Sequence, residues 1–185
     1  MTAEEAARIA GQIDGWMRDD SLQWLFNAAS RIDRQMIVEV GSWLGRSSVA
    51  IALGMGERHE MICVDTWKGT KNESEYYFKT EEPAVEIFKN NLLQYVGWLP
   101  RMIIGDSVES AALVADESIG LFFLDADHSE EAVTRDLRAW LPKMALGGIM
   151  AGHDSWHDPI KRALRNVFAG RVGDASSEIW MVTID

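Results

Sequence analysis

The chain has 185 residues, a length that predicts one domain with a sizeable hydrophobic core. Its 29 Asp and Glu residues outnumber 18 Lys and Arg, so the net charge is −11. Such an acidic protein repels phosphate backbones and anionic lipids, which argues against nucleic-acid and membrane partners. The single cysteine, Cys63, cannot form an internal disulfide, and the N-terminal residues lack the features of a signal peptide. We therefore expect a cytoplasmic protein.

Two helices are predicted before the first strand. Thr2 and Glu5 have the spacing of a capping box, which indicates a helix from Thr2 to Ile13. Ser21 is expected to cap a second helix, because apolar residues recur after it at helical spacing. We predict that residues 1–34 form a helical extension. It would pack over the binding side of the following domain or against the second subunit of a homodimer.

The stretch Met36–Ser48 (MIVEVGSWLGRSS) is typical of a strand, a glycine turn and the start of a helix. Gly41 and Gly45 lie in the predicted turn. Glycine lets the backbone approach a ligand closely, and the first turn of a helix offers unpaired N–H groups. Many α/β proteins use glycine here only to pack the helix on the strand. The turn alone is therefore a weak indication of a cofactor site.

Strands and helices alternate through the rest of the chain. Strands are predicted at residues 61–64, 102–104, 119–124, 147–152 and 179–184. This alternation predicts an α/β fold over residues 35–185, namely a Rossmann-like, doubly wound and mostly parallel sheet with helices on both faces. Between the second strand and the helix expected at Pro83, the segment Trp67–Glu82 has no regular pattern. We expect this segment to be a mobile lid that orders when ligands bind.

Acidic residues stand at or near the ends of five predicted strands. They are Glu39, Asp65, Asp106, Asp125 and Asp154. Ligands of open α/β sheets bind outside the carboxyl ends of the strands, so these side chains are expected to surround one crevice. Taken singly, some of these acidic residues have a simpler interpretation. Asp106, for example, could cap a helix and have no further role.

The acidic crevice favours a cationic cofactor. NAD carries two phosphates, which carboxylates beside the glycine turn would repel. S-adenosylmethionine carries a sulfonium and an ammonium group, and its ribose hydroxyls suit an acidic acceptor such as Asp65. The Gly-x-x-x-Gly spacing of Gly41 and Gly45 also departs from the dinucleotide pattern. We therefore predict S-adenosylmethionine as cofactor, with a nicotinamide-dependent oxidoreductase as the less favoured alternative.

Four segments together resemble a known family. They are VEVGSWLGRSS at 38–48, VDTWKG at 64–69, LDADH at 124–128 and GGIMAGHD at 147–154. They look like class I S-adenosylmethionine-dependent methyltransferases. The resemblance is strongest to the small-molecule branch with macrolide-sugar, cephalosporin-pathway and catechol O-methyltransferases.

This resemblance implies roles for individual residues. Glu39, Gly41, Ser42 and Gly45 would hold the methionine moiety, Asp65 the ribose, and Asp106 with Ser107 the adenine. The full set of expected cofactor contacts is Glu39, Gly41, Ser42, Gly45, Ser47, Asp65, Trp67, Asp106, Ser107 and Asp125. Metal-dependent members carry ligands at the positions of Asp125, His153 and Asp154. The catechol type usually has Asp-Asn at the last pair, so His153 would either bind the metal or face the substrate.

The metal prediction also has a chemical basis. Carboxylates of Asp125 and Asp154 suit Mg²⁺, which would lower the pKa of a substrate hydroxyl and hold it for attack on the methyl group. The alternative is a metal-free site in which both carboxylates only form hydrogen bonds. His128, at the start of a predicted helix, is the candidate general base beside Asp125. It could equally be an ordinary surface histidine.

The predicted activity is methyl transfer to a hydroxyl group of a small molecule. A protein that binds S-adenosylmethionine, or assists assembly, without catalysis is the alternative from another class. The retained carboxylates argue against it.

Overall fold

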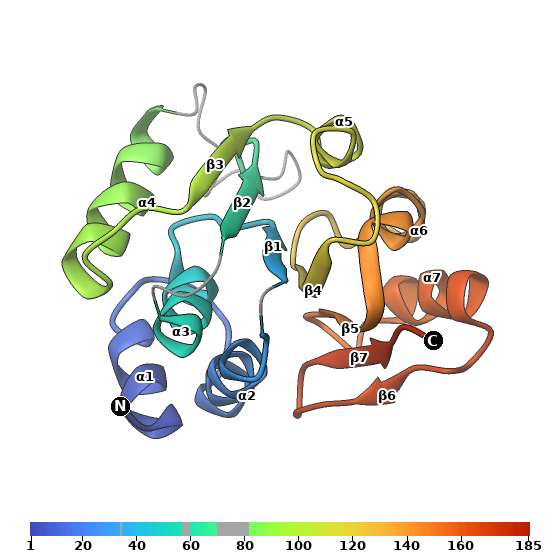
Figure 1. The fold of residues 1–185 in the computed structure, drawn as a ribbon, viewed down its shortest axis with the longest axis horizontal. Coiled ribbons are helices and arrows are strands. Elements are labelled where there is room, and N and C mark those ends of the chain that lie inside the picture. Colours follow the sequence, from blue (N-terminus) through green and yellow to red (C-terminus); the bar gives the residue numbers. More distant parts are fainter. Residues whose placement is uncertain (34, 57–59, 70–81) are drawn as a thin grey trace.

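The computed structural model describes residues 1–33, 35–56, 60–69 and 82–185. Within these residues the centre of the fold is a seven-stranded sheet with the order β3-β2-β1-β4-β5-β7-β6 (Figure 1). The strands are β1 Met36–Val40, β2 Met61–Asp65, β3 Arg101–Ile104, β4 Ile119–Leu124, β5 Met144–Gly152, β6 Gly173–Asp174 and β7 Trp180–Thr183. Strands β1 to β5 are parallel, and β7 joins β5 and β6 in antiparallel pairing.

Helices cover both faces of this sheet. The helices are α1 Ala3–Ala10, α2 Asp19–Ser30, α3 Arg46–Met55, α4 Glu82–Tyr95, α5 Ser107–Ala111, α6 Glu130–Trp140 and α7 Asp158–Phe168. Buried residues of α1 to α4 share one hydrophobic cluster with the sheet, and those of α5 to α7 share another (Figure 1). The prediction of a Rossmann-like α/β fold with helices on both faces is confirmed.

The N-terminal helices belong to the first of these clusters. The capping box of α1 is confirmed, because Thr2 Oγ1 accepts from Glu5 N at 3.2 Å and Glu5 Oε2 accepts from Thr2 N at 2.8 Å. The predicted cap at Ser21 is wrong. Helix α2 begins two residues earlier at Asp19, where acidic side chains favour a helix N-terminus, and Ser21 is buried inside it. The boundary at residue 34 stays a prediction.

Helices α2 and α3 approach each other closely. A Cβ atom at Gly54 of α3 would lie 2.3 Å from the carbonyl oxygen of Phe26 in α2. Only a residue without a side chain allows this backbone contact. The helical extension is thus fixed on the helix that follows the glycine turn.

The central strand β4 follows the sequence closely. All six residues of Ile119–Leu124 are buried, as a uniformly apolar strand covered on both faces requires. Strands β1 and β4 are neighbours. The strands that follow β1 in the sequence, β2 and β3, lie on one side of this pair, and those that follow β4 lie on the other. Ligands of such sheets bind at this switch point, beside the carboxyl ends of β1 and β4.

Several boundaries differ from the predictions. Strand β1 continues to Val40, which pairs with Val64 and Leu124, so Glu39 lies inside the strand and not at its end. Helix α5 is short and ends at Ala111. Of the predicted lid, residues 70–81 lie outside the described residues.

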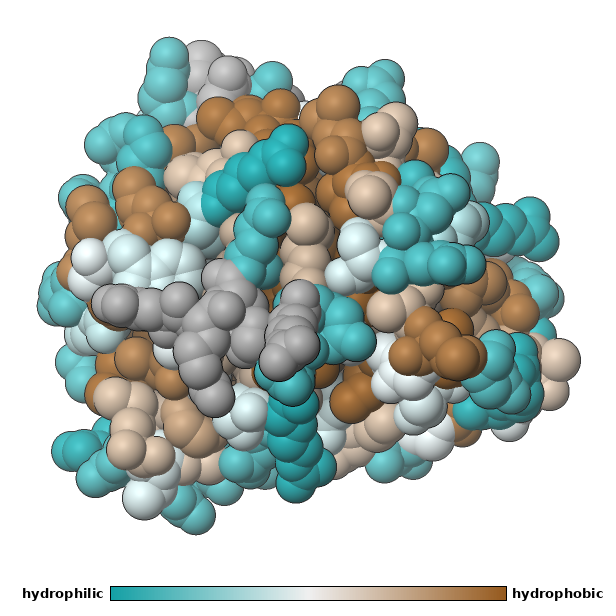
Figure 2. Space-filling view, viewed as in Figure 1, coloured by the Kyte–Doolittle hydropathy of each residue, from teal (hydrophilic) through white to brown (hydrophobic). Residues whose placement is uncertain are grey.

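The outer surface mixes polar and apolar side chains. On the side seen in Figure 2, hydrophobic residues are interspersed with hydrophilic ones. Isolated exposed apolar residues are normal for a folded domain. No described helix is long and apolar enough to cross a membrane. The homodimer stays a prediction.

Candidate active site

The glycine turn after β1 is tightly packed. Gly41 has φ +88°, and a Cβ there would lie 1.9 Å from the carbonyl oxygen of Asp125. Gly45 has φ +95° and precedes α3, and a Cβ there would lie 2.8 Å from Leu92 Cδ2 of α4. Gly41 is therefore required by backbone packing and Gly45 by its left-handed backbone conformation, without any ligand. Their contact with a cofactor stays a prediction.

Glu39 is fully buried behind this turn. Its carboxylate accepts hydrogen bonds from Ser47 at 2.5 Å and from Ser48, both in the first turn of α3. The thiol of Cys63 in β2 lies 3.6 Å from the same carboxylate. Burial raises the pKa of Glu39, although the serine hydrogen bonds oppose that change. In this structure Glu39 and Ser47 fasten α3 to β1.

Asp65 at the end of β2 holds two backbone segments. Its Oδ2 accepts from Trp43 N and its Oδ1 from Trp67 N, both at 2.7 Å. Burial raises the pKa of Asp65 against the effect of these bonds. Backbone groups of Thr66 and Ser42 also act on this carboxylate. Asp65 is partly exposed, and its contact with a cofactor stays a prediction.

The side chain of Trp67 lies in the hydrophobic core, and its contact with a cofactor stays a prediction. It is fully buried, its indole Nε1 donates to Trp43 O at 2.8 Å, and its ring packs edge-on against Phe88 at 5.2 Å. Trp67 therefore supports the glycine turn from inside the core.

Asp106 and Ser107 follow β3 and open helix α5. Asp106 accepts from Val108 N at 2.9 Å, which confirms it as a helix cap, and also from Arg135 of α6 at 3.2 Å. Ser107 Oγ accepts from Trp140 Nε1 at 2.9 Å. These contacts join α5 to α6 at the rim of the crevice.

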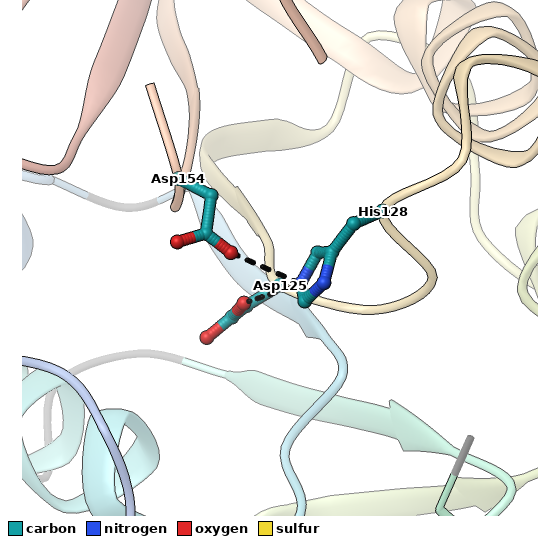
Figure 3. A group of neighbouring side chains, drawn as sticks. All are labelled: Asp125, His128 and Asp154. Carbon is teal, nitrogen blue, oxygen red and sulfur yellow. Dashed lines mark hydrogen bonds and ion pairs between the residues drawn. The ribbon is translucent and has the colours of Figure 1, made fainter. Parts of the chain in front are cut away.

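Asp125, His128 and Asp154 converge at the switch point (Figure 3). They come from the end of β4, the loop before α6 and the loop after β5. His128 Nε2 lies 3.5 Å from Asp125 Oδ1 and 3.2 Å from Asp154 Oδ2. One ligand atom from each residue lies within 4.8 Å of the others, so the three form a candidate metal site. Asp154 has φ +56°, a strained backbone conformation that is common at functional sites.

His153 lies beside this group and not within it. Its Nδ1 is 3.6 Å from Asp125 Oδ1 and 3.4 Å from Asp154 Oδ1, while its Nε2 is 3.3 Å from Glu178 Oε2. Burial would lower the pKa of His153, but the contacts with Asp125 and Asp154 outweigh it and raise the pKa to about 11. The group that the structure brings together contains His128 beside the two carboxylates. A role of His153 as metal ligand stays a prediction.

The electrostatics of Asp125 follow from the two histidines. Burial would raise its pKa, but hydrogen bonds from His128 and His153 lower the pKa to about 2. Asp125 is therefore ionised at any physiological pH. An anionic oxygen at the mouth of the crevice can bind a cation or accept a proton from a neighbouring group.

Sequence reasoning missed Arg46, the first residue of α3. Its guanidinium donates to the carbonyl oxygens of Met17, Ile13 and Gly11 at 2.9, 2.7 and 3.1 Å. It thereby ties the loop between α1 and α2 to the glycine turn. One signal was available, since a cation is unfavourable at a helix N-terminus and indicates a compensating contact.

This strand order, with a glycine turn after β1 and acids after β2 and β4, defines the class I methyltransferase fold. Comparison with family models gives a match to the methyltransferase domain over residues 38–155. The chain therefore belongs to the methyltransferase-domain family. The resemblance to class I S-adenosylmethionine-dependent methyltransferases is confirmed at the level of family and fold.

Solved structures share this fold at low sequence identity. The O-methyltransferase NovP is 15% identical with a TM-score of 0.70, over 91% of this chain and 81% of that one. TomG of Streptomyces achromogenes, an O-methyltransferase in complex with S-adenosylmethionine, is 15% identical with a TM-score of 0.66, over 99% and 88%. The Podospora anserina methyltransferase PaMTH1, bound to S-adenosylhomocysteine, is 12% identical with a TM-score of 0.68, over 99% and 88%.

A curated relative is similar in sequence but not in length. It is the uncharacterised protein y4gI of Sinorhizobium fredii (strain NBRC 101917 / NGR234), 28% identical over 144 residues. The match covers 76% of this chain and only 15% of that protein.

Proposed function

We propose that this protein transfers a methyl group from S-adenosylmethionine to a hydroxyl group of a small molecule. The observation that carries the proposal is the convergence of Asp125, His128 and Asp154 at the switch point of a methyltransferase fold. O-methylation requires a hydroxyl to be held in line with the methyl donor and to lose its proton. Two carboxylates and a histidine at one crevice mouth can supply both functions.

The residues around the crevice fit the cofactor. Asp65 is a partly exposed acid at the end of β2 that suits ribose hydroxyls, and Asp106 and Ser107 lie partly exposed after β3, where the adenine would be. The sulfonium and ammonium groups of the cofactor are cationic, and the acidic crevice favours them. The glycine turn would lie beside the methionine moiety.

The same three residues fit a divalent metal ion. Carboxylate oxygens suit Mg²⁺ or Mn²⁺, and an imidazole ligand favours a transition metal such as Mn²⁺. Asp125, His128 and Asp154 would be the ligands, with His153 as a hydrogen-bonding neighbour. When bound, such an ion lowers the pKa of the acceptor hydroxyl. In a site without metal, His128 is instead the general base, and Asp125 and Asp154 stabilise its protonated form.

Removal of metal tests this division of roles. Turnover is measured as S-adenosylhomocysteine formation with a panel of phenolic and sugar acceptors, before and after exhaustive EDTA treatment with verified metal content. We expect activity to need a divalent ion. Asp125→Asn and Asp154→Asn are expected to abolish turnover while cofactor binding survives. His128→Ala is expected to slow turnover less, because the two carboxylates would still hold the ion. Full activity without metal would make His128 the principal base.

The alternative cofactor is tested separately. Thermal unfolding in the presence of S-adenosylmethionine or NAD compares the two ligands directly, since a ligand that binds only the folded state raises the melting temperature. We expect a shift with S-adenosylmethionine alone. Binding without turnover on any acceptor would favour a binding or assembly role.

A further inference from the structure

Glu178, in the loop before β7, lies at the centre of a network that reaches from the N-terminal helices to the crevice. Its Oε2 accepts from Arg18 N at 3.1 Å and Ser21 Oγ at 3.3 Å, and lies 3.3 Å from His153 Nε2. Its Oε1 lies 3.3 Å from Arg18 Nε. The Glu178 side chain is only 14% exposed. Several separate contacts therefore fix one buried carboxylate.

This network continues into the candidate active site. The other ring nitrogen of His153 lies between Asp125 and Asp154, at 3.6 and 3.4 Å. A chain of contacts thus runs from Asp125 and Asp154 through His153 and Glu178 to Arg18 at the start of α2. Because each polar group lies within 3.6 Å of the next, each member restrains the orientation of its neighbour.

We propose that Glu178 is a positioning residue of the methyl-transfer site, which holds the His153 ring against Asp125 and Asp154. An imidazole held at one nitrogen can still rotate about its Cβ–Cγ bond, and a contact at the second nitrogen removes that freedom. Asp125 and Asp154 are then held at the spacing that the proposed function requires, on which this inference rests. The first turn of α2 becomes part of the active-site support.

Other residues besides Glu178 also connect α2 to the loop before β7. Asp20 Oδ2 accepts from Ser177 Oγ at 2.5 Å and from Ser177 N at 3.2 Å. Arg18 also donates to Ser177 Oγ at 2.6 Å. Asp20 therefore joins the same two segments, and its contacts within the described part of the chain do not include His153. It is a matched control for the effect of joining these segments.

The test compares Glu178→Gln with Asp20→Asn in the full chain. Each variant neutralises one acid at the same interface, and only Glu178 contacts His153. The first readout is the ¹H–¹⁵N spectrum of the histidine rings, with the His153 signals assigned from their loss in His153→Asn. We expect slowly exchanging His153 ring protons in the wild type and in Asp20→Asn. In Glu178→Gln the Nε2 proton signal is expected to be lost.

The second readout is the affinity for Mn²⁺ alone, measured by electron paramagnetic resonance. Outer contacts that orient metal ligands change metal affinity by about 10–100-fold, so Glu178→Gln is expected to weaken Mn²⁺ binding about tenfold. Asp20→Asn is expected to leave it unchanged. Both variants should bind S-adenosylmethionine like the wild type.

Identical His153 signals in the wild type and Glu178→Gln would overturn the proposal, and so would equal changes in the two variants. If Glu178→Gln does not fold, Glu178→Asp carries the same test, since it keeps the charge but withdraws it by one methylene. In Glu178→Asp the intensity of the His153 ring-proton signals should lie between the wild-type intensity and zero. Signals of wild-type intensity would again refute the role. A wild type that binds no Mn²⁺ and methylates no acceptor contradicts the proposed function instead, while the ring spectrum still decides the role of Glu178.

Discussion

Replacement of Gly41 by alanine tests how the glycine turn and the active site are packed together. A Cβ atom at this position would lie 1.9 Å from the carbonyl oxygen of Asp125, 2.4 Å from its carbonyl carbon and 2.9 Å from Ala126 N. Cβ atoms essentially never approach other atoms closer than 3.0 Å, so the turn after β4 would have to move by more than 1 Å. All three atoms are backbone, so no side chain can rotate away.

The cost has separable parts. Alanine at φ +88° costs about 1–2 kcal/mol. Displacement of packed atoms costs typically about 1–3 kcal/mol. The hydrogen bond from Asp125 N to Val40 O, 2.8 Å long, is worth about 1 kcal/mol and would be strained. We therefore expect Gly41→Ala to lower the free energy of unfolding by about 3–6 kcal/mol, a large fraction of the 5–15 kcal/mol typical of a domain.

Gly97 provides the matched control. Its φ is +87°, nearly that of Gly41, but a Cβ atom there would have no neighbour within 4 Å. Gly97→Ala should therefore cost only the backbone term of about 1–2 kcal/mol. Urea unfolding followed by circular dichroism measures both variants. Equal destabilisation of the two would refute the close contact between the turn and Asp125.

Two further substitutions test single contacts of the site. Asp65→Ala is expected to weaken S-adenosylmethionine binding by about 1–3 kcal/mol, because it leaves ligand hydroxyls unpaired; calorimetry showing unaltered affinity would remove Asp65 from the cofactor site. Arg46→Lys is expected to destabilise the protein by about 1–3 kcal/mol, since one ammonium group cannot reproduce the forked contacts with Gly11, Ile13 and Met17. Urea unfolding measures that loss, and a change below about 0.5 kcal/mol would show that the contacts contribute little to stability.

The fold could be predicted because its signals are local. The uninterrupted apolar run of β4 and the alternation of strands with amphipathic helices are properties of short segments. The convergence of Asp125 and Asp154 also followed, since parallel strands bring their carboxyl ends to one edge of the sheet. The position of the His153 ring did not follow. His153 N still pairs with Leu124 O, and the left-handed backbone of Asp154 then redirects the chain, which no sequence pattern indicates.

The role of Glu178 was unpredictable for a different reason. Its partners Arg18 and Ser21 are about 160 residues away in the sequence and belong to another layer of the fold. Such a contact depends on how α2 docks, and docking depends on the packing of the whole cluster. Glu39 illustrates the same limit, because the sequence places it at a strand end and only the pairing of Val40 shows that β1 continues.

Asp136 in α6 is a buried acid whose charge opposes folding. Its side chain is almost completely buried, and among the described residues its Oδ1 has no hydrogen-bond partner. The nearest cation, Arg135, lies 4.0 Å away. Burial raises the pKa of Asp136 to about 6, against the effects of Ser107 and Arg135. The folded protein therefore holds this proton more tightly than the unfolded chain.

The sign of the pH dependence follows from this difference. Below about pH 4 the carboxyl group is neutral in both states and costs nothing. As the pH rises from about 4 to about 6, the unfolded chain releases this proton while the folded protein still holds it, so stability falls over this range and stays at the lower level above it. The difference between the two pKa values corresponds to a loss of roughly 1–3 kcal/mol above pH 6. Asp136→Asn keeps the shape and stays neutral, so it should be more stable than the wild type at pH 8 by about that amount and equal to it at pH 4.

Asp33→Asn serves as the control, because it removes one negative charge at an exposed position and so reports the general relief of self-repulsion in a protein of net charge −11. Urea unfolding at pH 4 and pH 8 gives the four free-energy differences. If Asp136→Asn were less stable than the wild type at pH 8, the charged carboxylate would be contributing to folding through Arg135, and burial would not be the dominant effect. If Asp136→Asn raised the free energy of unfolding at pH 8 no more than Asp33→Asn does, the buried charge of Asp136 would cost no more than that of an exposed carboxylate.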